Sequence, residues 1–172
     1  MNSCAAISGL IMLVVTNLAA IVSFATPYWR EQTSSTEGLW ATCHGTQCQW
    51  VFDNNKDLAE SNDYIIATQG LMSVGLTVCL IALLVSTLAL CCQCNSCNYT
   101  GFVAGLMITA FLSIGIAVAV YGIKSSKEKK AGISFDNGHD FRFGWSFWVG
   151  AGAAIMALLT SLLYGCSSKK ED

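Results

Sequence analysis

The chain has 172 residues and a formal net charge of −2; 53% of its residues are hydrophobic and only 12% are charged. Soluble globular proteins carry roughly 25% charged residues, about twice this share. So few charges cannot cover a water-facing surface. The composition therefore excludes an ordinary soluble domain and indicates a membrane protein.

The charged residues leave three long gaps in the chain. No Asp, Glu, Lys or Arg occurs before Arg30, between Asp63 and Lys124, or between Arg142 and Lys169. A helix needs about 20 apolar residues to cross a hydrocarbon core roughly 30 Å thick, so the outer gaps hold one span each and the middle gap holds two. The pattern predicts four transmembrane helices, near residues 5–25, 64–91, 101–123 and 145–166.

The connections between these spans set the topology. Only the short polar stretch 93–100 separates the second and third spans, which makes them antiparallel neighbours. The large loops 27–63 and 124–144 therefore share one side of the membrane. Ser23, Phe24 and Ala25 resemble a signal-peptide cleavage site, but the first apolar run is longer than usual and has no basic flank. We expect a retained span there.

Two features favour opposite orientations. Lys and Arg are concentrated in the two large loops, which the positive-inside rule would place in the cytoplasm. Cys43 and Cys48, however, flank four residues in a loop rich in strand formers, a spacing that a disulfide across a short hairpin can close. A disulfide requires an oxidising compartment. We follow the cysteines, and expect both loops outside and both termini in the cytoplasm.

A second group of cysteines gathers at the opposite side, at the predicted helix ends. Reversible palmitoylation acts on juxtamembrane cytoplasmic thiols of this kind. Plain reduced thiols are the alternative, and a zinc site is disfavoured because four ligands within seven residues, without a nearby His, strain a tetrahedron. The candidate acylation sites are Cys91, Cys92, Cys94, Cys97 and Cys166.

The spans lack the residues that transport and catalysis need. Proton relays, voltage sensors and most coupled transporters use ionisable residues at membrane depth, and the spans contain none. The histidines, His44 and His139, both fall in loops, so no span offers a nucleophile beside a base. Residues 136–140 contain Asn-Gly, a pair that indicates a tight turn much more strongly than it indicates a metal site. We expect no enzyme, no cofactor or metal, and no nucleic-acid partner.

The first loop carries a series of residues that resembles a known signature: Trp29, Gly38, Leu39, Trp40, Cys43 and Cys48. It is similar to the first loop of the superfamily of claudins, peripheral myelin protein, epithelial membrane proteins and lens fibre membrane protein. Residues 143–147, which enter the fourth span, extend the resemblance over nearly the whole chain. It implies an all-α membrane protein, a left-handed four-helix bundle capped outside by a small antiparallel β-sheet, in one domain over residues 1–172.

Details of the sequence refine this resemblance. The compact first loop looks more like the lens fibre and epithelial membrane protein branch than like a vertebrate claudin. Gln69 stands where many relatives carry an arginine that contacts the region beneath the sheet, which leaves that contact in doubt. The printed sequence ends without the hydrophobic residue that a PDZ domain captures, so we expect no PDZ ligand.

Local patterns predict the sheet and the helix packing. Leu39 and Ala41 alternate with polar or aromatic neighbours as in a strand, and a turn over 44–47 uses Gly45 for an unusual backbone angle. Two small-xxx-small pairs, Gly101 with Gly105 and Gly150 with Ala154, are interpreted as packing sites inside the bundle rather than dimer contacts. Asn17, an amide deep in the first span, is expected to bond another helix.

The loops carry opposite charges, a pattern that fits either contacts between like molecules or loops that are simply solvated. Our first hypothesis is a structural junction protein that adheres by lateral and trans self-association in the plasma membrane. A second is an auxiliary or trafficking subunit of another membrane protein. A third is a paracellular cation pore, whose charge rings would use loop acids. The candidate interaction or pore acids are Asp53, Asp57, Glu60 and Asp63.

Overall fold

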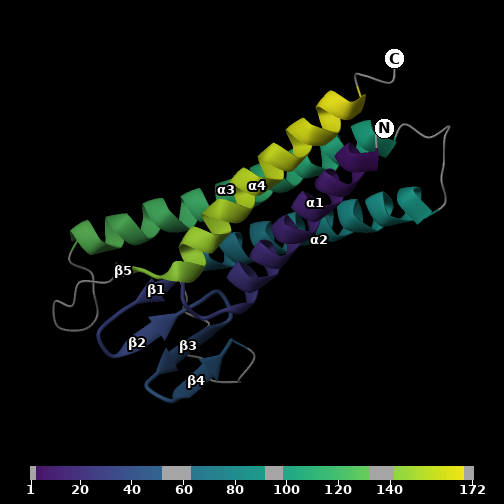
Figure 1. Ribbon diagram of the computed structural model, residues 1–172. Coiled ribbons are helices and arrows are strands. Elements are labelled where there is room, and N and C mark those ends of the chain that lie inside the picture. Colours follow the sequence, from purple (N-terminus) through teal and green to yellow (C-terminus); the bar gives the residue numbers. More distant parts are fainter. Residues whose placement is uncertain (1–2, 52–62, 92–98, 132–141, 169–172) are drawn as a thin grey trace.

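The computed structural model describes residues 3–51, 63–91, 99–131 and 142–168. Four long helices form a bundle; a small sheet covers one end, here called the sheet end, and the start of α1 and the end of α4 lie at the far end (Figure 1). Each helix is long and apolar enough to cross a membrane, which confirms the four predicted spans. The helices are α1 (Ser3–Ala25), α2 (Asp63–Cys91), α3 (Tyr99–Ala131) and α4 (Trp145–Ser168).

The bundle is apolar on its outside and built of small residues within. Ile7, Leu84 and Leu162 are each more than half exposed on the outer surface. Each helix contacts the next, and α4 returns to α1. Small interior residues let helices approach closely in lipid, where no hydrophobic gradient drives their association. The fully buried interior alanines include Ala20, Ala82, Ala110, Ala117, Ala153 and Ala157.

The sheet joins the two loops at the sheet end. It has five antiparallel strands in the order β4-β3-β2-β1-β5. The first loop supplies four strands, and the fifth comes from the segment just before α4, so the sheet ties the chain after α1 to the chain before α4. This confirms the predicted antiparallel sheet. The strands are β1 (Arg30–Glu31), β2 (Ser35–Glu37), β3 (Ala41–His44), β4 (Gln47–Trp50) and β5 (Arg142–Phe143).

A tight hairpin joins β3 to β4, as the sequence predicts. His44 pairs with Gln47, and Gly45 between them has a φ of 61°, a left-handed conformation that side chains disfavour. Cys43 and Cys48 lie directly opposite each other in this register and form a disulfide. The predicted disulfide is therefore confirmed, and it fixes the register of the hairpin.

Helix α3 is longer than predicted. The prediction ended it at Ile123, but the helix continues to Ala131, so the first part of the predicted loop 124–144 is helical. The segment from Lys124 onward has no Gly or Pro until Gly132, and its lysines and glutamate favour helix. Hydropathy shows where a chain leaves the hydrocarbon, so it placed the end of the helix at Ile123. A helix can continue into water beyond that point, because its backbone hydrogen bonds do not require an apolar sequence.

One of the two predicted small-residue contacts lies inside the bundle and the other does not. Gly150 and Ala154 are buried, and a Cβ on Gly150 would lie 2.6 Å from Ser23 Oγ of α1. Gly101 and Gly105 are instead exposed, and a Cβ on Gly105 would meet nothing within 4 Å. The interpretation of this second pair as an internal contact is wrong, because spacing alone does not tell which face a glycine occupies.

Asn17 links two helices, as expected. Its Nδ2 donates hydrogen bonds to the carbonyl of Leu13, at 2.9 Å within α1, and to the carbonyl of Cys79, at 3.2 Å on α2. Its buried Oδ1 accepts none from the described residues. Such bonds contribute only about 0.6 kcal/mol in a membrane bundle, so Asn17 orients α1 against α2 more than it stabilises them.

Candidate functional site

The residues of the predicted signature meet at the junction between bundle and sheet. Trp29 is fully buried there, just before β1. Its ring packs edge-on against Tyr121 of α3 and Phe147 of α4, with centroid distances of 5.0 and 6.0 Å. Edge-to-face aromatic pairs add to the large area that an indole buries. Trp29 therefore fixes the first loop to the two helices beneath it.

Backbone and hydroxyl groups complete this junction. Trp29 Nε1 donates to the carbonyl of Ser23 at 2.7 Å, and the amide of Trp29 donates to the carbonyl of Glu37 at 2.9 Å. Ser23 Oγ donates to the carbonyl of Ser146 at 2.9 Å, and Thr26 bonds the Ser146 hydroxyl. These bonds join the end of α1, the sheet and the start of α4. Satisfied buried polar networks of this kind specify one arrangement.

Gly38 and Leu39 hold the turn between β2 and β3 against the bundle. A Cβ on Gly38 would overlap the backbone of Pro27, so only glycine fits there. Leu39 is buried, and its carbonyl accepts a hydrogen bond from Gln69 Nε2 of α2. The sequence left this contact beneath the sheet in doubt because glutamine replaces the arginine common in the family. Gln69 makes a contact there as a neutral donor.

The Gln69 contact predicts the effect of removing its donor. Replacing Gln69 with Leu leaves the Leu39 carbonyl without this bond, and should lower the free energy of unfolding in detergent micelles by about 1–2 kcal/mol. Gln69→Arg keeps a donor and should recover most of the loss. Gln49→Leu, an exposed change on β4, should alter stability by less than about 0.5 kcal/mol. Equal stability of Gln69→Leu and the wild type would show that the bond contributes nothing.

Trp40 belongs to the same junction, and the rest of the sheet projects beyond it. Trp40 packs edge-on against Phe24 of α1, with 5.1 Å between ring centroids. The neighbouring β4 is an outermost strand of the sheet, and its residues are exposed along its whole length. Trp50 on this edge is 46% exposed. Among the described strands β4 is at the edge of the sheet, and an edge strand with an exposed indole is suited to contacts with another protein.

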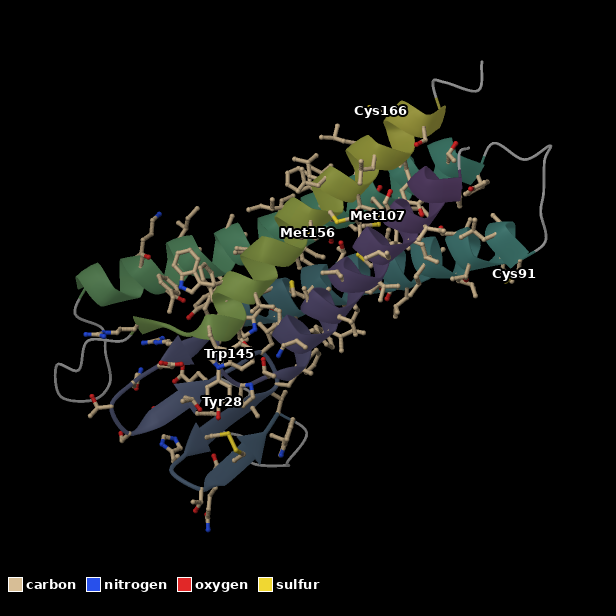
Figure 2. All side chains as sticks on the ribbon, in the orientation of Figure 1. Tyr28, Cys91, Met107, Trp145, Met156 and Cys166 are labelled. Atoms are coloured by element: carbon tan, nitrogen blue, oxygen red, sulfur yellow. A yellow bond between two sulfur atoms is a disulfide. The ribbon has the colours of Figure 1, made fainter. Side chains whose placement is uncertain are left out.

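An exposed aromatic pair lies at the base of the sheet. Tyr28 and Trp145 stack at 5.5 Å, and Figure 2 shows them together at the sheet end. Trp145 is 44% exposed, and Trp148 is 64% exposed one turn further along α4. Exposed indoles at helix ends are typical of the membrane–water interface. They place that interface near the start of α4.

The charged candidates are only partly described. Arg30 and Glu37 lie opposite each other across β1 and β2 and form an ion pair of 3.7 Å. Asp63 is the first residue of α2 and is exposed. A carboxylate is favourable there because the free backbone amides at a helix N-terminus carry partial positive charge. Asp53, Asp57 and Glu60 lie outside the described residues. Within those residues, no cluster of three or more His, Cys, Asp or Glu could hold a metal ion.

The free thiols divide between the bundle interior and its far end. Cys79 is buried in α2, whereas Cys91 and Cys166 are exposed. Figure 2 shows Cys91 and Cys166 at the ends of α2 and α4, away from the sheet. Cys92, Cys94 and Cys97 lie outside the described residues. The two exposed thiols thus share one end of the bundle, opposite the disulfide.

Sequence reasoning missed the helical half of this junction. Tyr121 of α3 contacts Trp29 and also Tyr64 of α2, with ring centroids 5.9 Å apart. Ser146 and Phe147 were named only as part of residues 143–147, without a role at this junction. A weak signal existed for Tyr121, because it is an aromatic residue near the end of its span, on the side of Trp29. No local pattern pairs Ser146 with Ser23, because the two residues are far apart in the sequence.

Together, the bundle and this junction define a multi-pass membrane protein that carries a disulfide-braced sheet on one end of four spans. The model of the PMP-22/EMP/MP20/Claudin family matches residues 3–164, and the chain belongs to that family. This confirms the resemblance seen in the first loop.

Several individual proteins are similar to this chain. "p53 apoptosis effector related to PMP-22" of Danio rerio is 28% identical over 134 residues, covering 78% of this chain and 66% of that protein. Claudin-1 of Mus musculus is 28% identical over 185 residues, covering 95% and 85%. "Lens fiber membrane intrinsic protein" of Homo sapiens is 26% identical over 171 residues, covering 95% and 91%. Since the last two match at similar identity, the lens fibre or epithelial branch stays a prediction.

Proposed function

We propose that this protein is a structural membrane protein of cell–cell junctions, which adheres by lateral and trans self-association through its sheet. The observation that carries the proposal is the rigid mounting of the sheet. Trp29 and the Ser23–Ser146 bond fix it to three helices, and the Cys43–Cys48 disulfide braces its outer hairpin. A preordered surface loses little conformational freedom when it binds, so more of the contact energy remains as affinity. Membership of the claudin family supports the same function.

The disulfide provides a direct test of this proposal. Replacing both Cys43 and Cys48 with Ser should destabilise the hairpin by about 2 kcal/mol, because the closed loop is short. The variant should still reach the cell surface, since Trp29 anchors the sheet independently, but aggregation of transfected cells should fall several-fold. Cys79→Ala, which removes a free thiol of α2 away from the sheet, is the control. Unchanged aggregation of cells that carry the double variant on their surface would contradict adhesion through the braced sheet.

The orientation belongs to the proposal. A disulfide forms in an oxidising compartment, which supports placing the sheet outside the cell and both termini in the cytoplasm. An epitope inserted after Gly45, in the exposed turn, should then bind antibody on intact cells, whereas an epitope at either terminus should need permeabilised cells. With the sheet outside, Cys91 and Cys166 are candidate cytoplasmic palmitoylation sites, together with Cys92, Cys94 and Cys97.

A second candidate function rests on the exposed face of α3. Gly101, Gly105 and Thr109 repeat at four-residue intervals and are all exposed, and such faces let another transmembrane helix approach closely. An auxiliary subunit would use this face to hold a larger membrane protein. Gly105→Leu should then abolish copurification of that protein at fixed stoichiometry, while Gly70→Leu, at an equally open glycine of α2, should not. Recovery of self-oligomers alone would count against this role.

A further inference from the structure

An open groove of about 660 Å³ lies between α3 and α4, near the sheet end. Its lining is almost entirely apolar. Small residues shape it, including Gly115, Ala119 and Gly122 of α3, and Phe147 and Trp148 contribute aromatic rings from α4. A volume of this size falls within the range of small-molecule sites, roughly 300–1,000 Å³.

The length and position of the groove match one leaflet of a membrane. Its α3 lining runs from Gly115 to Lys127, which at 1.5 Å per residue is about 18 Å along the helix. Half of a hydrocarbon core roughly 30 Å thick is about 15 Å. Lys127 is also the last residue of the apolar span in α3. The apolar length of the groove therefore matches the depth of about one leaflet, with Lys127 at its outer end.

The charges at the groove are arranged for an anionic head above an apolar tail. Lys127 and Ser126 are its polar lining residues, and no carboxylate of a described side chain lines it. Lys127 is exposed and has no ion-pair partner among the described residues. The other described cations nearby are Lys124, also exposed, and Arg142, which faces Glu31 across β1 and β5.

We propose that this groove holds one phospholipid, with an acyl chain along the small residues and its phosphate at the Lys127 ammonium and the Ser126 hydroxyl. A transmembrane helix fits less well. Another helix would bury only apolar surface here and has no fixed group for the Lys127 ammonium, whereas a phospholipid supplies both an acyl chain for the apolar lining and a phosphate for Lys127 and Ser126. The lipid would be a bound component of the protein, distinct from those that exchange freely around its surface.

Native mass spectrometry of the full chain, released from mild detergent, tests the proposal. The probes are 1-palmitoyl-2-oleoyl phosphatidylglycerol and the diacylglycerol with the same chains. We expect a one-to-one phosphatidylglycerol adduct, and weaker binding of the diacylglycerol. Ala119→Trp, at an exposed lining residue, should abolish the adduct by filling the groove. Ala67→Trp, at an exposed alanine of α2 outside the groove, should leave it unchanged.

A pair of lysine variants tests the headgroup contact without filling the groove. Lys127→Gln should weaken phosphatidylglycerol binding about fivefold and leave diacylglycerol binding unchanged. Lys124→Gln removes the same charge three residues away, outside the lining, and should have little effect. This pair decides the matter if size-exclusion chromatography shows that Ala119→Trp does not fold. Equal binding by both lysine variants would overturn the proposal. So would an Ala119→Trp variant that retains lipid but loses self-association, because the occupant would then be a second copy.

Discussion

Replacing Trp29 with Ala should lower the free energy of unfolding by about 3–5 kcal/mol, the range measured when buried tryptophans are truncated. The indole is fully buried between the sheet, Tyr121 and Phe147, so its truncation leaves a cavity at the junction. The Ser23 carbonyl also loses its donor. Because typical domains are stable by only 5–15 kcal/mol, much of the protein should be retained inside the cell.

Surface biotinylation and thermal unfolding in detergent measure this effect, and Trp145→Ala provides the control. That change removes the same side chain at the same end of the bundle, but from a residue that is 44% exposed and whose one aromatic partner among the described residues is Tyr28. It should cost about 0.5–1.5 kcal/mol. If the two variants reach the surface equally, Trp29 does not anchor the sheet as described here.

Gly38→Ala should destabilise the protein by about 3 kcal/mol, although it adds only one methyl group. The new Cβ would overlap the Pro27 backbone and lie 2.9 Å from the Thr26 carbonyl oxygen. A crowded backbone cannot rotate away as a side chain can, so the turn between β2 and β3 must move. That movement would disturb the Gly38 amide, which donates to the Ala41 carbonyl at 2.9 Å.

The same substitution at Gly70 should have the opposite sign. A Cβ there meets nothing within 4 Å, and Gly70 lies inside α2, where alanine favours helix by about 0.5–1 kcal/mol over glycine. Thermal unfolding of the two variants in one detergent compares them directly. A Gly38→Ala protein as stable as Gly70→Ala would mean that the turn has room that the structure does not show.

Much of the fold could be predicted because membranes impose strong rules on sequence. Gaps between charged residues placed all four spans, since a charge inside hydrocarbon is costly. The hairpin followed from Gly45 and the cysteines around it, which are close in sequence. By contrast, the end of α3 was predicted too early, because the pattern of apolar residues ends at the membrane surface while the helix continues in water.

The junction between bundle and sheet was predicted only in part for a different reason. The resemblance identified Trp29, Gly38 and Leu39, but their partners come from other helices. Gln69 is 30 residues away from Leu39, and Ser146 is 123 residues from Ser23. Pairings over such separations depend on how helices rotate against one another. The exposed pair Gly101 and Gly105 was misinterpreted for the same reason.

The proposed function requires that the sheet mediate contact between molecules on adjoining cells. Two cell populations that express differently coloured fusions of the protein, mixed and imaged, test this claim directly. We expect enrichment at boundaries where both cells express it, and none where only one does. Uniform membrane staining at every boundary would contradict adhesion through the sheet, and would favour a role for the exposed face of α3.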